Sequence, residues 1–571
     1  MAAMKKFTST LYFLTLFVLF AGIFFISLQK PVVIDYEESV SAEISRAMHA
    51  AGEPILPSLN GVEFFAKPPM LSWAQMLGYQ MFGVNALGAR FFNGVAALAT
   101  ILVFYFGTVR PLGSRVAFNS SLVLGSSIMF IYLARVALPD MLLTLFLVSC
   151  IMGFWYGIEC YLIDKSGSVF FWLACFCASL AMLTTGTISL LLPVLTAICY
   201  LLSIGRPGAL FNRKWLLPGT AIIVLGGFSW YLLIGFMHPD GFEFMKELFI
   251  THHAGLLSSP VEGHSGSIFY YLIILFVGFM PWFGYLPRAL LNIPLKRTGQ
   301  PGHRYLRLFG LFSIIVFLFF SIVDSKLPYY ILPALPGFAL LIGYLFESRG
   351  TTETTGTGTT VGWRIAGWTG AVPAGLLGIV LFALPLVFPF LAELTGEDAY
   401  KVPALFEPVE LGWSPYLAGA LFLLSAGLLV HTVRASAARL FETLVICSLI
   451  NGCTLFFLVI PLYDRLIDAP LTSLAEEAAA LSPPNGIIVM YEIDDRPSVN
   501  FVSGLTTIEH DERELQDLPA LFERPEITTG LTTSFYFEGM QNRGMKPVEI
   551  GRNTGFVLFR FVPTTGELPE G

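Results

Sequence analysis

Apolar stretches of about 20 residues recur along this chain, and each is long enough to cross the hydrocarbon core of a bilayer as a helix. This repetition limits the possible folds more than any other feature. It predicts an α-helical polytopic membrane protein with about 13 transmembrane helices. The predicted spans are 9–28, 86–108, 116–134, 141–161, 168–185, 187–204, 215–236, 268–288, 307–323, 329–347, 365–389, 414–432 and 441–462.

The composition excludes several classes of protein. Hydrophobic residues make up 55% of the 571 residues and charged residues make up 13%, whereas soluble proteins carry about 25% charged residues. A disordered chain, a nucleic-acid-binding protein and an ordinary soluble enzyme are therefore excluded. The seven cysteines all lie in apolar runs, where we expect them to pack as small hydrophobic side chains.

Lys and Arg are distributed unevenly between the two sides of the predicted spans. With Lys5 and Lys6 inside, the inside segments hold 17 Lys and Arg residues, and the outside loops before residue 464 hold seven. Because cytoplasmic loops carry an excess of these residues, the N-terminus is predicted to be cytoplasmic. The first span ends at 27–31 without a small-residue cleavage site, so we expect an uncleaved anchor.

The end of the chain differs from the rest in charge. Residues 464–571 hold 18 acidic and 8 basic residues, a net charge of −10, although the whole chain carries only −7. We therefore predict a multi-span domain at 1–463, with external loops at 31–85 and 237–267, and an extracytoplasmic soluble α/β domain at 464–571. Its expected elements are β-type runs at 486–492, 535–537 and 555–561 and a helix near 472–481.

The first external loop holds the most candidates for chemistry. Asp35, Glu37 and Glu38 precede a segment that has the spacing of an amphipathic helix, with apolar residues at 44, 48 and 51. Carboxylates there are expected in water at the bilayer edge, beside a helix that lies along the membrane surface. The alternative is that these acids only complement the positive end of the helix.

Lys67 closes the same loop and is followed by two prolines. Proline fixes φ and stiffens the backbone, so the ammonium group is a candidate ligand for a phosphate. The alternative is a lysine that reaches toward lipid headgroups.

Two short external turns and one long loop add further polar residues. Arg135 and Asp140 lie in the first turn, Lys326 and Tyr330 lie in the second, and His264 lies in the long loop. The histidines of that loop do not have the spacing of a known metal motif. The chain also lacks a Walker A motif, a G-x-S-x-G motif and a dinucleotide fingerprint, so nucleotide-driven chemistry is not supported.

Several strings in these loops together resemble a known family. They are A-E-I-S-R-A-M at 42–48, K-P-P at 67–69, A-R to D at 134–140, H-x₅-Y-Y at 264–271, P-W at 281–282 and S-K-L-P-Y-Y-I-L-P at 325–333. The set resembles the bacterial branch of the protein O-mannosyltransferase-like, GT-C superfamily of glycosyltransferases, and within it the aminoarabinose transferases that modify lipid A. The resemblance covers residues 30–340. Ala66 and Thr185 stand where the family has an acid and a lysine.

The resemblance implies a function and a site. The family moves a sugar from a polyprenyl-phosphate carrier to an acceptor, which here would be a lipid A-like glycolipid or a protein, at the outer face of the bacterial inner membrane. The implied catalytic acid is Glu37, with Asp35 and Glu38 as neighbouring candidates. The implied carrier-binding residues are Lys67, Tyr330 and Lys326, and the remaining candidates are Asp140, Arg135, His264 and Glu43.

We expect an inverting mechanism in which Glu37 or Asp35 takes the proton of the acceptor hydroxyl. Lys67 and Tyr330 would stabilise the charge that develops on the departing phosphate. The sequence indicates no required cofactor and no nucleic-acid partner, and it gives a divalent metal no specific support. A transporter or lipid flippase is the alternative, but it would place charges along a path near the bilayer midplane, whereas the charges of this chain gather at the outer face.

Overall fold

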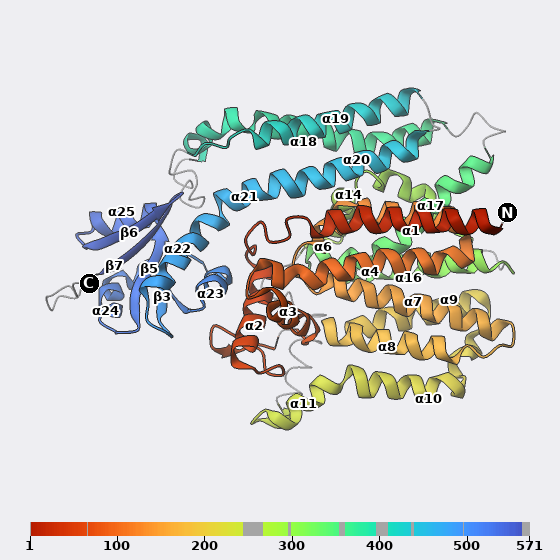
Figure 1. The fold of residues 1–571 in the computed structure, drawn as a ribbon, viewed down its shortest axis with the longest axis horizontal. Helices are drawn as coiled ribbons and strands as arrows, with labels where there is room; N and C mark the ends of the chain where they lie inside the picture. The colour runs from red at the N-terminus through yellow and green to blue at the C-terminus, as the bar shows by residue number, and fades with distance from the viewer. Residues whose placement is uncertain are drawn as a thin grey trace.

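The computed structural model describes residues 2–65, 67–243, 266–294, 299–352, 360–395, 409–435, 439–494 and 496–561. Long helices run side by side through most of the molecule, and a small sheet with short helices lies at one end of them (Figure 1). The N-terminus lies at the opposite end of the long helices from this sheet (Figure 1).

The helices long and apolar enough to cross a membrane number nine in the described residues, or up to twelve if each of three bent pairs is one span. The pairs bend by 69° after Ser126, by 44° after Gly227 and by 116° after Gly278. A further apolar helix, α9 (Ile188–Ile204), is shorter. All thirteen ranges predicted from the sequence fall on these helices. The structure differs from the prediction in the bends, which hydropathy does not detect.

The bounds of these helices fall into two groups. The long helices are α1 (Ala2–Phe25), α4 (Ala86–Leu112), α7 (Asp140–Leu162), α8 (Ser168–Thr185), α16 (Pro301–Ile322), α17 (Leu335–Thr352), α18 (Thr360–Thr395), α19 (Ser414–Ala435) and α20 (Leu440–Thr454), which continues through a π-helical turn (Leu455–Val459) into α21 (Ile460–Leu466). The shorter ones are α5 (Ser114–Ser126), α6 (Ile128–Ala134), α10 (Arg213–Ile222), α11 (Ser229–Met237), α14 (Tyr270–Gly278) and α15 (Leu286–Leu291).

Small residues let some of these helices approach closely. A Cβ atom at Gly343 of α17 would lie 2.6 Å from the backbone nitrogen of Ser120 on α5, so only glycine fits there. Such contacts are the usual basis of helix packing in membranes, where burial from water gives no driving force between helices.

The loop between α1 and α4 folds into two helices, α2 (Glu37–Ala51) and α3 (Met70–Phe82), and a two-stranded hairpin of β1 (Ser58–Leu59) and β2 (Val62–Glu63). The expected amphipathic helix is therefore present as α2. It is more buried than a surface helix, because α3 and the C-terminal unit both pack against it.

The last part of the chain forms a five-stranded sheet with order β4-β3-β5-β7-β6. Its strands are β3 (Ile487–Tyr491), β4 (Thr506–His510), β5 (Ile527–Thr533), β6 (Pro547–Asn553) and β7 (Phe556–Phe561), and its helices are α22 (Asp468–Leu481), α23 (Pro497–Ser503), α24 (Leu518–Leu521) and α25 (Ser534–Asn542). Strand β3 pairs in parallel with β4 and β5, and β7 pairs antiparallel with β5 and β6. We call residues 468–561 the C-terminal unit.

One expected strand of this unit is wrong. Residues 535–537 begin the helix α25, in which Phe537 is buried and Phe535 is exposed. The alternation of aromatic residues there reflects a helix with one buried face. The β-type runs near 487–491 and 556–561 and the helix that ends at Leu481 are present.

Prediction for helix packing. Gly343→Ala should lower the free energy of unfolding by about 1–3 kcal/mol, because the new methyl group overlaps α5. The control is Gly427→Ala on α19, where a Cβ atom meets nothing within 4 Å. Because alanine favours a helix over glycine, this variant should keep or raise the stability. Thermal unfolding of both variants in detergent measures the difference, and equal midpoints would contradict the close packing.

Prediction for the start of the C-terminal unit. Asp468 begins α22, is 2% exposed and has no hydrogen bond to its carboxyl oxygens among the described residues. Burial, helped by the negative charge of Asp35 and opposed by Arg496, raises the pKa of Asp468 to about 7. The folded state therefore holds a proton that the unfolded chain releases at a pH near 4, so this residue makes stability fall as the pH rises from about 4 to 7.

Asp468→Asn should remove that loss, so the stability of this variant should fall less than that of the wild type between pH 5 and pH 8. Thermal unfolding across this range measures the effect. Asp511→Asn changes an exposed acid of the same unit and serves as the control. Parallel pH profiles for the wild type and Asp468→Asn would contradict the prediction.

Candidate active site

Three carboxylates lie at the start of α2, and the structure gives each a different environment. Glu38 is buried, Asp35 contacts the C-terminal unit, and Glu37 is half-buried beside two cavities. The sequence predicted all three as neighbouring candidates for the catalytic acid. Their contacts show which of the three carboxylates is available to bind a substrate.

Glu38 forms a buried ion pair with Arg90 of α4. The Nε and Nη2 atoms of Arg90 each donate to Glu38 at 2.6 Å, and both side chains are at most 2% exposed. Glu38 also accepts from the backbone nitrogens of Ile34 at 2.9 Å and Ala137 at 2.7 Å. All of its hydrogen-bonding capacity is used inside the protein, so Glu38 holds the site together and has no free oxygen for a substrate.

Asp35 binds the C-terminal unit. Its carboxylate accepts hydrogen bonds from the backbone nitrogen of Ser498 at 3.1 Å, the hydroxyl of Ser498 at 2.5 Å and the hydroxyl of Ser39 at 2.5 Å. The Nη1 atom of Arg496 lies 3.7 Å away, and the Asp35 side chain is 4% exposed. With these donors around it, Asp35 is not free to take a proton from an acceptor in this arrangement.

Glu37 is the acid of the three that remains accessible. Its side chain is 27% exposed, and its Oε2 atom accepts a hydrogen bond from the Nζ atom of Lys67 at 3.3 Å. Lys67 also lies over the ring of Tyr329, 6.0 Å from its centre. Pro68 and Pro69 follow directly and lead into α3, so the backbone that carries Lys67 is stiff.

Two cavities meet at Glu37. The first, of about 190 Å³, is lined by residues of the first external loop and of two turns, including Glu37, Lys67, Pro139, Thr184 and Tyr330. The second, of about 400 Å³, is mostly apolar and lies between α6, α14 and the turn at 327–329, and Asp35, Glu37 and Glu38 all belong to its lining. Lys67 is the one cation that lines either cavity within the described residues. A charged site joined to an apolar cavity suits a ligand with a charged head and a lipid tail.

Asp140 extends this cluster at the first residue of α7. It is 2% exposed, and its Oδ2 atom has no hydrogen-bond partner among the described residues. The charges of Lys67 and Glu37 both act on it. The structure thus brings together Glu37, Lys67 and Asp140, which are far apart in the sequence.

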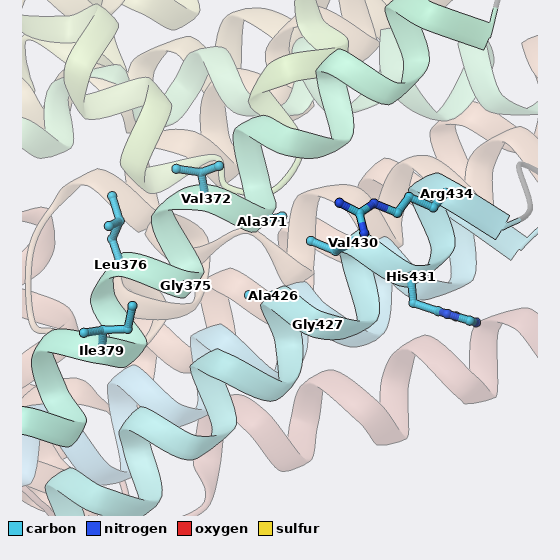
Figure 2. A pocket seen from close by; sticks show the side chains of 10 residues that line it. All are labelled: Ala371, Val372, Gly375, Leu376, Ile379, Ala426, Gly427, Val430, His431 and Arg434. Carbon is cyan, nitrogen blue, oxygen red and sulfur yellow. The ribbon is translucent and has the colours of Figure 1, made fainter.

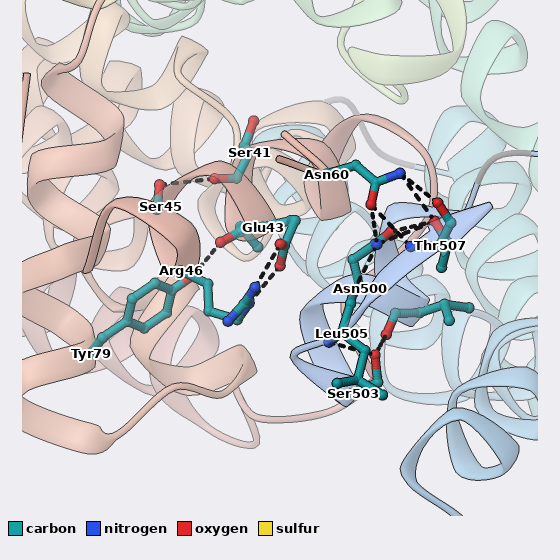
Figure 3. A network of polar contacts seen from close by, with 12 residues as sticks. Ser41, Glu43, Ser45, Arg46, Asn60, Tyr79, Asn500, Ser503, Leu505 and Thr507 are labelled. Carbon is teal, nitrogen blue, oxygen red and sulfur yellow. Dashed lines mark hydrogen bonds and ion pairs between the residues drawn. The ribbon is translucent and has the colours of Figure 1, made fainter. Parts of the chain in front are cut away.

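Three other predicted candidates have structural contacts. The ammonium of Lys326 donates to the carbonyls of residues 320, 321 and 323 at 2.5–2.8 Å, so it caps the end of α16. Arg135 donates to the carbonyls of residues 23 and 26 at the end of α1 and stacks on Phe456. Glu43 pairs with Arg46 at 2.7 Å (Figure 3), and burial raises the pKa of Glu43.

These contacts leave Lys326, Arg135 and Glu43 outside the cluster that faces the cavities. Tyr330 lines the first cavity, and its role in carrier binding stays a prediction. His264 lies outside the described residues. No group of three or more His, Cys, Asp or Glu side chains in the described ranges is arranged to hold a metal ion.

Sequence reasoning missed three residues that shape the site. Arg90 is an arginine inside an apolar run, and a buried charge needs a partner, so the sequence did contain a signal for it. Tyr329 directly precedes the predicted Tyr330, and the sequence does not indicate that both tyrosines lie at the site. Ser498 carries no signal, because its contact with Asp35 joins residues 463 positions apart.

A larger groove lies elsewhere. It measures about 830 Å³ and runs between α18 and α19, where Figure 2 shows small and apolar side chains with His431 and Arg434 at one end. Its described lining residues include no acid, in contrast to the two cavities at Glu37.

The chain is similar to known membrane glycosyltransferases. Residues 66–233 match the family described as dolichyl-phosphate-mannose-protein mannosyltransferase. An uncharacterised protein of Aquifex aeolicus is 30% identical over 373 residues, which are 65% of this chain and 69% of that protein. The chain belongs to the protein O-mannosyltransferase-like, GT-C family of membrane glycosyltransferases.

Other members of the GT-C family are similar over different lengths. The undecaprenyl phosphate-α-4-amino-4-deoxy-L-arabinose arabinosyl transferase of Edwardsiella ictaluri is 31% identical over 340 residues, 59% of this chain and 60% of that protein. The chain thus spans less than two thirds of this relative. ArnT from Cupriavidus metallidurans, crystallised with undecaprenyl phosphate, has a TM-score of 0.75 at 21% identity and covers 96% of this chain and 98% of its own, which shows a shared fold.

Prediction for the two adjacent glutamates. Glu38→Gln should lower the free energy of unfolding by about 3–5 kcal/mol, because it leaves the buried charge of Arg90 without its partner. Glu37→Gln should lower it by less than about 1 kcal/mol, because the pair of Glu37 with Lys67 is partly exposed. Denaturant unfolding of the two variants measures both values. Equal stability for the two would contradict the separate roles given to these residues.

Proposed function

We propose that this protein transfers a sugar from a polyprenyl-phosphate carrier to a lipid A-like glycolipid or a protein. One observation carries the proposal: the Glu37–Lys67 pair lines a cavity that shares Glu37 with a second, larger and mostly apolar cavity. A donor of this kind has an anionic phosphate between its sugar and its lipid chain, and it therefore needs a cation next to an apolar cavity. Membership of the GT-C family supports the same chemistry.

On the donor side, Lys67 would hold the phosphate while the apolar cavity holds the lipid chain. Phosphate is a good leaving group at neutral pH, so it needs charge stabilisation more than a proton. A fixed ammonium group in a site that excludes water supplies this stabilisation as the charge develops. Tyr330 lines the same cavity, and its hydroxyl would donate a second hydrogen bond to the phosphate.

On the acceptor side, Glu37 would act as general base. It takes the proton of the acceptor hydroxyl while the hydroxyl oxygen attacks C1 of the sugar. The bond from C1 to the phosphate oxygen breaks at the same time, and the polyprenyl phosphate leaves with the electron pair. A single displacement of this kind inverts the configuration at C1.

The relatives suggest which sugar is carried. The transferase of Edwardsiella ictaluri is named for undecaprenyl phosphate and 4-amino-4-deoxy-L-arabinose. We propose an undecaprenyl-phosphate-linked sugar of this class as the donor. Glu37, which lines both cavities, would favour a sugar with a cationic amino group over a neutral one.

The proposed location is the bacterial inner membrane. The N-terminus and the C-terminal unit lie at opposite ends of the helices (Figure 1), which supports a cytoplasmic N-terminus and an extracytoplasmic unit when combined with the distribution of Lys and Arg. We propose the division into domains at 463/464 on the same basis. The site then faces the outer side, where it lies beside the C-terminal unit.

The transporter alternative is less well supported. In the nine long apolar helices of the described chain, each Asp, Glu, Lys and Arg lies within the first or last seven residues. A transport path would place such residues near the middle of the spans.

Prediction for transfer. In proteoliposomes with a labelled polyprenyl-phosphate sugar and envelope lipid as acceptor, Glu37→Gln should lower the rate about 10²–10⁴-fold, which is the usual contribution of a general base. Lys67→Ala should also lower it strongly. Glu53→Gln changes an acid of the same loop that lines neither cavity and should keep the wild-type rate. If Asp35→Asn abolished transfer while Glu37→Gln retained it, Asp35 would be the base.

A further inference from the structure

We propose that Ser498 of the C-terminal unit is a positioning residue for Glu37. It acts through Asp35, which it holds at the start of α2, so that the soluble unit sets the geometry of the membrane-side site. This inference rests on the proposed function of Glu37 as the base. It gives the C-terminal unit a part in the reaction rate, in addition to any part in acceptor access.

The contact is direct and nearly closed to solvent. Ser498 donates to both oxygens of Asp35, from its backbone nitrogen at 3.1 Å and from its hydroxyl at 2.5 Å. Hydrogen bonds to an ionised carboxylate are about twice as strong as those between neutral groups. The Asp35 side chain is 4% exposed, so water does not compete strongly for these bonds.

The same carboxylate also holds the first turn of α2. The hydroxyl of Ser39 donates to Asp35 at 2.5 Å and lies 2.8 Å from the carbonyl oxygen of Tyr36. Tyr36 and Glu37 stand between these two residues, and both line the two cavities. Asp35 and Ser39 thus fix the backbone on either side of Glu37, and Ser498 fixes Asp35.

Glu37 itself has fewer restraints. It is half-buried, its Oε2 atom accepts a 3.3 Å hydrogen bond from Lys67, and its side chain also interacts with Tyr329. The position of its carboxylate therefore depends on the backbone that carries it. A displacement of about 1 Å between a catalytic group and its substrate can cost about 10²-fold in rate, so a loose turn here would be measurable.

A second contact provides a matched control. Asn60, in the turn between β1 and β2, exchanges hydrogen bonds with the backbone of Thr507 at 2.9 Å and 3.0 Å, and Asn500 donates to Asn60 at 3.2 Å (Figure 3). This contact also joins the loop to the C-terminal unit, but it does not involve residues 35–39. If the C-terminal unit affects transfer only by packing against this loop, weakening either contact should lower the rate of transfer equally.

The experiment compares Ser498→Ala, Ser498→Thr and Asn60→Gly in the full-length protein. Glycine suits position 60 because its φ is +49°. Sugar transfer gives kcat and KM for the donor, hydrogen exchange reports the amides of residues 36–41, and thermal unfolding reports global stability. The conservative Ser498→Thr keeps a hydroxyl and tests rescue.

We expect Ser498→Ala to lower kcat about 10-fold or more with little change in KM, since a displaced base affects the chemical step more than donor binding. Faster exchange at residues 36–41 should accompany the loss. Ser498→Thr should restore both quantities, and Asn60→Gly should change neither.

Unchanged exchange at residues 36–41 in Ser498→Ala would overturn the proposal whether or not transfer is observed. Wild-type kcat in Ser498→Ala would also overturn it, as would an equal loss of kcat in Asn60→Gly. Absence of transfer by the wild-type protein would count against the proposed function, and the exchange measurement would still decide whether Ser498 orders this turn.

Discussion

The buried ion pair between Glu38 and Arg90 organises the parts of the molecule that form the site. Arg90 donates to Glu38 and also to the carbonyls of residues 28, 31 and 32, while Glu38 accepts from the backbone at 34 and 137. One pair thus joins the segment after α1, the start of α2, the helix α4 and the turn before α7. Charges buried in this way persist only when every group is satisfied, because an unpaired one costs several kcal/mol. The pair therefore fixes where the neighbouring Glu37 stands.

Three acids within four residues show how environment decides the role of a side chain. Glu38 is fully hydrogen-bonded, pairs with Arg90 and has a structural role. Asp35 faces the C-terminal unit and joins it to the membrane domain. Glu37 retains a partly exposed carboxylate beside Lys67 and lines both cavities. The acid proposed as the base is the one with the fewest hydrogen bonds inside the protein, and the contacts of the other two hold the backbone around it in place.

Much of the membrane domain could be predicted from sequence because hydropathy is a local property. The bends in three spans could not, since a bent apolar pair and a straight span have similar composition. The strand β5 (Ile527–Thr533) was missed because it is a central strand, buried on both faces and rich in threonine, so it lacks alternation. The three acids could not be ranked because their partners are distant: Arg90 lies 52 positions from Glu38, and Ser498 lies 463 positions from Asp35. The role predicted for Lys326 rested on a string in which a helix-capping lysine and a phosphate-binding lysine look the same.

In the proposed reaction, Glu37 and Lys67 carry out a single displacement at the sugar carbon of a lipid-linked donor. The most direct measurement is the anomeric configuration of the transferred sugar, determined by NMR on product from the purified protein and a donor of known configuration. We expect inversion, because the acceptor oxygen attacks opposite the departing phosphate. Retention would contradict it, since two successive displacements would then be needed, with a protein side chain such as Glu37 bonded to the sugar in between.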